Sequence, residues 1–76
     1  MTEELTDVER DLLSELTTQE GRSPSELALA IDADYGAVLG AVGDLRDRGL
    51  VDRRGFDTCR LTERGREVAA EASDRN

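Results

Sequence analysis

One stretch of the sequence, LRDRGLVDRRGFDTCRLTERGR at residues 45–66, constrains the fold more than any other. Gly49 is typical of a residue that ends a helix. The runs 50–54 and 58–61 have strand composition and are separated by a short turn that contains glycine, which is the pattern of a β-hairpin. A helical pattern resumes over about 63–73. The stretch therefore predicts a helix, a two-stranded hairpin and a closing helix in direct succession.

Two helices are predicted near the start of the chain, over about 6–19 and 24–31. Each begins with a capping box, in which a hydroxyl and a carboxylate three residues apart satisfy each other's backbone amides. The boxes are Thr6–Glu9 and Ser23–Glu26. Leucines at helical spacing give the first helix an apolar side. The second helix is expected to bury Leu27, Ala30 and Ile31.

A third helix is predicted over about 35–48, with Asp34 as its cap. Its core face is expected at Val38, Val42 and Leu45. The closing helix has a smaller apolar stripe (Val68, Ala69, Ala72), which either covers the core or pairs with a second copy. A third short strand is expected near 21–23. The fold class is mainly α with a small β-hairpin, in one domain over 1–76 that is ordered over about 5–73.

The composition argues against an enzyme. The chain has no His and a single cysteine, Cys59, so it lacks the usual general base, the usual metal ligands and any internal disulfide. No cofactor and no metal are implied. We expect the Cys59 thiol to be a buried structural group, because it alternates with Arg60 along a strand. No apolar run approaches membrane-spanning length, and the acidic start is unlike a secretion signal. A cytoplasmic protein without membrane contact is predicted.

Charge is distributed unevenly along the chain. The net charge of −8 comes from 18 acidic residues and 10 Arg, with no Lys. Residues 1–43 have a net charge of −8, and residues 44–66 have a net charge of +2. The only positive stretch thus coincides with the end of the third helix and the hairpin, where a polyanion would be accepted. The acidic, lysine-free composition resembles that of proteins from salt-in halophilic archaea. The alternative is an acidic interaction protein.

The order of elements and three sequence stretches resemble a winged helix-turn-helix domain, similar to archaeal regulators of the MarR-like type. The stretches are SPSELALAID, DLRDRGLVDRRG and CRLTERGREVA. The resemblance implies a small DNA-binding transcriptional regulator whose partner is double-stranded DNA. It implies that the third helix, about 35–48, enters the major groove and that the hairpin, or wing, contacts the DNA backbone or the minor groove. The implied contacts are Tyr35 at the groove and Arg53, Arg54 and Arg60 on the wing, whose guanidinium groups suit phosphate oxygens.

The third helix departs from the pattern of a base-reading helix. Its outward face is predicted at Asp34, Tyr35, Gly36, Ala37, Gly40, Gly43 and Asp44. Bases are read by bidentate donors such as Arg or Asn, and only Tyr35 here has a long side chain with a donor. The glycines suggest instead that another backbone approaches closely, either a DNA strand or a protein.

An alternative function follows from that face. Gly36, Leu39, Gly40 and Gly43 would form a close-contact face for a partner helix, making the chain a winged-helix protein–protein interaction module without DNA binding. The partner would be another protein or a second copy of the chain. A third interpretation is that the glycines lie on an unused surface.

Overall fold

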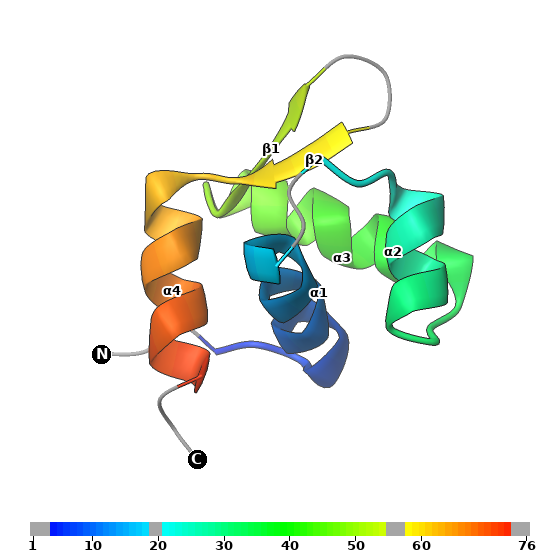
Figure 1. Cartoon of the computed structure of the whole chain (residues 1–76), viewed down its shortest axis with the longest axis horizontal. Coiled ribbons are helices and arrows are strands. Elements are labelled where there is room, and N and C mark those ends of the chain that lie inside the picture. Colours follow the sequence, from blue (N-terminus) through cyan, green and yellow to red (C-terminus); the bar gives the residue numbers. More distant parts are fainter. Residues whose placement is uncertain (1–3, 19–20, 55–57, 74–76) are drawn as a thin grey trace.

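The computed structural model describes residues 4–18, 21–54 and 58–73. Its helices are α1 (Asp7–Thr18), α2 (Pro24–Ala30), α3 (Tyr35–Asp47) and α4 (Glu63–Ser73), and its strands are β1 (Val51–Arg54) and β2 (Thr58–Leu61). Figure 1 shows the hairpin projecting from one end of a helical body. The fold is the predicted winged helix-turn-helix. The predicted turn at 55–57 and the frayed end at 74–76 lie outside the described residues.

The predicted caps set the helix boundaries. The Thr6 amide donates to Glu9 Oε1 at 2.9 Å, and the Glu9 amide donates to Thr6 Oγ1 at 3.1 Å. The same reciprocal pair links Ser23 and Glu26 at the start of α2. These bonds satisfy amides that a helix start otherwise leaves without partners, which is why local sequence located both starts.

The core lies where α1, α2, α3 and the hairpin meet. Its largest fully buried side chains are Leu12, Leu13, Leu16, Leu27, Val38, Leu45, Leu50 and Cys59. The prediction that Ala30 is buried is wrong. Ala30 is exposed and Ala28 is buried instead, because the core side of α2 follows Pro24, Leu27 and Ala28 at helical spacing. Cys59 is fully buried, as expected.

The hairpin is antiparallel and gains one further partner. Arg22 forms an isolated antiparallel bridge with Cys59, in which the Gly21 amide donates to the Cys59 carbonyl at 3.0 Å and the Cys59 amide donates to the Arg22 carbonyl at 2.8 Å. The contact lies where a short third strand was expected, near 21–23, but it is a single bridge beside a two-stranded sheet, and no third strand forms in this described part of the chain. The bridge fixes the base of the hairpin beside the start of α2.

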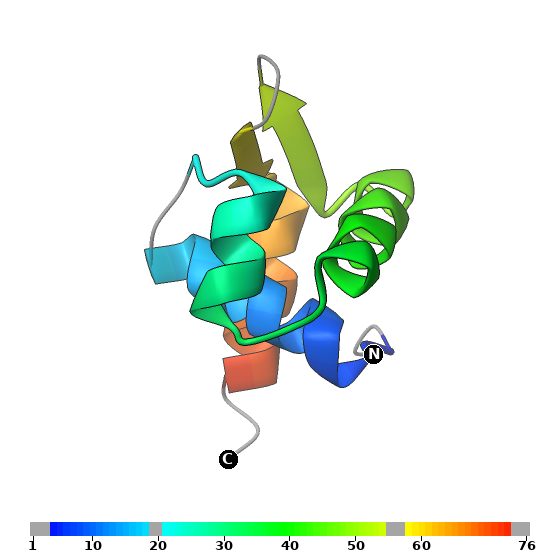
Figure 2. The ribbon, with the colours of Figure 1, turned by 90° about the vertical axis from the view of Figure 1, so that its right-hand side faces the viewer.

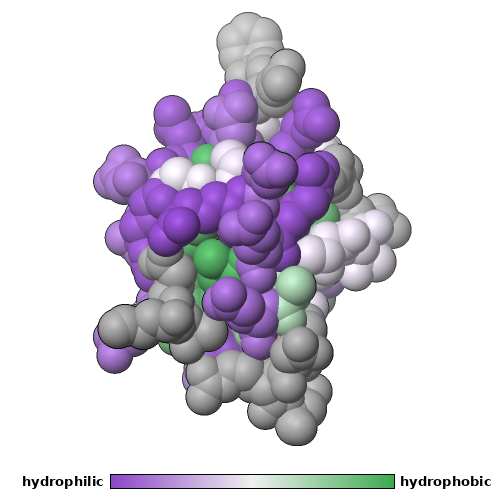
Figure 3. Space-filling model, turned by 90° about the vertical axis from the view of Figure 1, so that its left-hand side faces the viewer, coloured by the Kyte–Doolittle hydropathy of each residue, from purple (hydrophilic) through white to green (hydrophobic). Residues whose placement is uncertain are grey.

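Helix α4 covers the core on the side of α1. Val68 and Ala69 are buried in the core cluster, so the apolar stripe of α4 serves this chain's own interior. Figure 3 shows that the face of the molecule on this side is largely hydrophilic, with a small hydrophobic patch. In the part of the chain that the structure describes, no helix has both the length and the apolar character needed to span a membrane.

Candidate nucleic-acid interface

Helices α2 and α3 are joined by a tight, well-bonded turn. Asp32 adopts a φ of 56°, and the Ala33 amide donates to the Ala28 carbonyl at 2.9 Å. Asp34 then caps α3 by accepting the Ala37 amide at 3.3 Å. Figure 2 shows this turn leading into α3, with β1 leaving the opposite end of α3. The geometry presents one side of α3 and the hairpin to the solvent.

The side of α3 opposite the core is a stripe of small residues that ends in an acid. Gly36, Gly40, Gly43 and Asp47 recur at intervals of four, three and four residues, so they share one side of the helix. A Cβ added at Gly40 or Gly43 would meet nothing within 4 Å. The fold itself therefore does not require glycine at either position.

Replacing Gly40 by Ala should stabilise the folded chain. Gly in a helix interior costs about 1 kcal/mol relative to Ala, and the site has room for a methyl group. We expect the free energy of unfolding in urea to rise by about 1 kcal/mol. An unchanged or lower value would show that α3 requires the glycine for its own packing.

Three long side chains flank one edge of this stripe. Tyr35, Leu39 and Arg46 follow one another at spacings of four and seven residues, and Tyr35 and Leu39 are 51% and 43% exposed. Arg46 is exposed, and within the described residues its side chain makes no ion pair or hydrogen bond. Arg46 was not among the contacts expected from the sequence, although its seven-residue spacing from Leu39 places it on the same edge of the helix.

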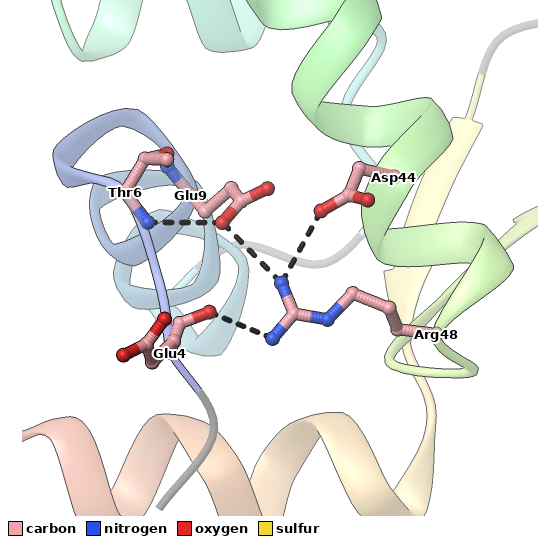
Figure 4. Close-up of polar contacts among 5 residues, drawn as sticks. All are labelled: Glu4, Thr6, Glu9, Asp44 and Arg48. Atoms are coloured by element: carbon pink, nitrogen blue, oxygen red, sulfur yellow. Dashed lines mark hydrogen bonds and ion pairs between the residues drawn. The ribbon is translucent and has the colours of Figure 1, made fainter.

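The opposite edge of the stripe faces α1. Asp44 is exposed, as expected for the outward face, with 51% of its side chain accessible, and its carboxylate lies 3.2 Å from Nη1 of Arg48 and points toward α1 (Figure 4). Arg48 Nη1 also lies 3.4 Å from Glu9 Oε1, and Nη2 donates to the Glu4 carbonyl at 2.7 Å. Arg48 therefore ties the end of α3 to the start of α1 and pairs with the Asp44 charge.

The two carboxylates in this cluster have opposite pKa shifts. Burial of Glu9, whose side chain is 8% exposed, raises its pKa above 4.5, and the neighbouring Asp44 raises it further. Hydrogen bonding to Glu9 and then to Arg48 lowers the pKa of Asp44 below 3.8. Folding thus favours the protonated form of Glu9 and the ionised form of Asp44.

A Glu9→Gln variant should change the dependence of stability on pH. Because the pKa of Glu9 is raised, its contribution is fully present below 4.5 and is lost as the pH rises through the raised value. The contribution of Asp44 is present above 3.8 and is lost as the pH falls through its lowered pKa. We expect the wild type to lose stability relative to Glu9→Gln between mildly acid and neutral pH, as measured by urea unfolding. A difference in unfolding free energy that stays constant over this pH range would contradict the raised pKa of Glu9. Glu67→Gln on α4 is the matched control.

The wing arginines do not form one cluster. In the hairpin register Arg53 pairs with Cys59, and Asp52 pairs with Arg60. Paired residues point to the same face of a sheet and neighbours alternate, so Arg53 and Arg60 project from opposite faces. Arg54 holds the register position opposite Thr58. The structure thus places basic groups on both sides of the wing, with Asp52 beside Arg60.

Arg60 also lines a shallow polar depression with Asp52, Leu61, Thr62 and Arg66. No group of three His, Cys, Asp or Glu side chains that could hold a metal ion occurs in the described ranges. Tyr35 and the wing lie at opposite ends of α3, whose 13 residues span about 20 Å. A ligand contacting both would be an elongated one.

Solved structures with the same fold are known. One is the Mycobacterium tuberculosis MarR-family protein Rv2887, crystallised in complex with DNA, which is 33% identical to this chain. The match covers 92% of this chain and 54% of the Rv2887 chain, with a TM-score of 0.87. A MarR-family transcriptional regulator from Rhodococcus sp. RHA1 is 28% identical, covering 93% of this chain and 54% of its own, with a TM-score of 0.85. The PcaV transcriptional regulator from Streptomyces coelicolor, at 24% identity, covers 96% of this chain and 56% of its own with a TM-score of 0.91.

These structural neighbours are MarR-family winged-helix transcriptional regulators. The chain spans about half the length of each of them. Neither a protein-family model nor a curated protein matches the sequence.

Proposed function

We propose that the chain is a DNA-binding transcriptional regulator of the MarR type. The observation that carries the proposal is the likeness to Rv2887, a MarR-family protein crystallised with DNA, over 92% of this chain. The positive net charge of residues 44–66 within an otherwise acidic chain supports the same function. The lack of His supports a regulator that is not an enzyme.

Arg53, Arg54 and Arg60 are the proposed phosphate contacts. Arginines on both faces of a hairpin suit a wing that lies between two phosphate strands. The length of α3, about 20 Å, corresponds to about six base pairs of duplex. Tyr35 and Arg46 would then lie at the groove, and Arg46 is the one guanidinium on that edge of α3.

The glycine stripe determines how α3 would approach DNA. Gly36, Gly40 and Gly43 offer no side-chain donor for a base edge, so the stripe permits close backbone approach and little direct reading. Asp47 at the end of the stripe would be repelled by a phosphate. Discrimination between sequences would then come from the shape of the duplex more than from base contacts.

Salt dependence tests the proposed phosphate contacts. The three wing contacts predict a slope of log affinity against log salt of about −2.7, so a tenfold rise in salt should lower the affinity about 500-fold. Fluorescence anisotropy of a labelled duplex over a series of KCl concentrations measures this slope. The acidic, lysine-free composition supports a cytoplasm of high salt as the working environment, where screening shortens the reach of remote acids to about 3 Å. A slope near zero would contradict phosphate contact.

The second candidate function is a protein–protein interaction module. It is favoured by the open space at Gly40 and Gly43 and by the exposed Leu39 beside them, which together form a shallow face for a partner helix or a second copy. Gly40→Arg separates the two functions. It should block docking on this face, whereas it should preserve or strengthen duplex binding, because it adds a guanidinium at the groove.

A further inference from the structure

A second concave surface lies between α2 and the start of α3, beside the glycine stripe. It is lined by Ser25, Ala28, Leu29, Asp32, Ala33 and Tyr35. Leu29 is 84% exposed, the most exposed large hydrophobic residue among those described. The DNA contacts proposed above use only Tyr35 of this set, so the exposure of Leu29 has no role in them.

The concavity is held in shape by backbone hydrogen bonds. The Asp32 amide donates to the Leu29 carbonyl at 3.3 Å, and the Ala33 amide donates to the Ala28 carbonyl at 2.9 Å. Asp34 is fixed as the cap of α3. Leu29 and Tyr35 therefore face solvent from two elements whose relative position is already set, and a ligand would bind without reorganising the turn.

The segment that forms the concavity is acidic. Residues 23–43 contain Glu26, Asp32 and Asp34 and no Arg or Lys, and all three carboxylates are on exposed residues. A second copy would place the same acids against one another. Charge complementarity therefore favours an occupant with basic side chains. The exposed Leu29 and Tyr35 favour apolar side chains on the same occupant.

We propose that this concavity, formed by Leu29, Tyr35 and the acids around them, binds a short basic segment of a partner protein that carries bulky apolar side chains between arginines or lysines. The apolar side chains would pack on Leu29 and Tyr35, and the cations would lie against Asp32 and its neighbours. This interaction surface shares Tyr35 with the proposed DNA contacts, but its other residues lie outside the glycine stripe and the wing, and it does not depend on DNA binding.

The test is an amide-shift titration of isotope-labelled protein with a capped peptide that alternates arginine with leucine. We expect shifts centred on Ser25, Leu29, Asp32 and Tyr35. Leu29→Ser should weaken binding about tenfold, because the variant loses burial of one leucine side chain. Leu39→Ser, which alters an exposed leucine outside the concavity, should leave the affinity unchanged.

Four results would overturn the proposal. The first is an absence of shifts at millimolar peptide, and the second is equal binding of a peptide with aspartate in place of arginine. The third is equal weakening by the two leucine variants, which would show no preference for the concavity. The fourth is shifts of the same residues on concentrating the protein alone, which would show that a second copy occupies the surface.

Discussion

Gly65→Ala should destabilise the fold more than any other single methyl group added to a glycine of the described chain. A Cβ at Gly65 would lie 1.9 Å from the Leu50 carbonyl oxygen and 3.3 Å from Leu61 Cδ2. The Leu50 oxygen cannot withdraw easily, because it accepts the Thr62 amide at 3.0 Å. The first turn of α4 would have to move away from β1.

That movement would also strain the cap of α4. Thr62 Oγ1 accepts the Gly65 amide at 3.0 Å and donates to the Gly49 carbonyl at 2.7 Å. We expect a loss of about 3 kcal/mol in the free energy of unfolding and a fall in Tm of about 15 °C. Urea and thermal unfolding measure both values. Gly40→Ala is the matched control, and wild-type stability of Gly65→Ala would refute the close approach of Gly65 to the Leu50 carbonyl.

Reversing two wing charges should strongly weaken duplex binding while leaving the fold intact. Arg53→Glu with Arg54→Glu removes two of the three proposed phosphate contacts and places two carboxylates at the wing. The slope of log affinity against log salt should become shallower, from about −2.7 to about −0.9 or closer to zero. The affinity at low salt should fall about a hundredfold. Arg53 is exposed, so the unfolding free energy should change little.

A charge-matched control separates contact from general repulsion. Arg10→Glu makes the same change in net charge as the single variant Arg53→Glu, but it lies on α1, where Arg10 is 3.6 Å from Asp7. Arg10→Glu should leave duplex affinity within about twofold of wild type, because screening removes remote charges. Equal losses in Arg10→Glu and Arg53→Glu would indicate net charge as the cause and would rule out a specific wing contact.

The secondary structure could be predicted from the sequence because its boundaries are fixed by local chemistry. The two capping boxes, the Asp34 cap and Gly49, which has a φ of 77°, act within a few residues of themselves. Each helix end therefore differed from its prediction by about one residue. Two of the core residues expected for α2 differ, because Ala30 is exposed and Ile31 is only partly buried. Both depend on the rotation of a short helix whose direction is set by what packs against it.

The candidate site was harder to predict because it depends on contacts between distant residues. Arg48 meets Glu9 across 39 positions of sequence, and it also pairs with the Asp44 carboxylate. The faces of Arg53 and Arg60 follow from the hairpin register, which the composition of the strands does not specify. The concavity at Leu29 arises only when α2 and α3 are placed together by their turn.

Together these features divide the molecule into surfaces with different charge. The wing and the end of α3 carry five of the ten arginines, and the charged residues of α2 and of the turn before α3 are all acids. Arg48 neutralises Asp44 between them. This division supports a molecule that meets a polyanion at one end of α3 and a basic partner at the other.

The measurement that tests the central proposal most directly is an amide-shift titration of the labelled protein with a generic duplex, at low salt and again at molar KCl. Shifts centred on Tyr35, Arg46, Arg53, Arg54 and Arg60 that weaken steeply with salt are the predicted result. An absence of shifts in these residues at both salt concentrations would contradict the proposal that the wing contacts the DNA backbone.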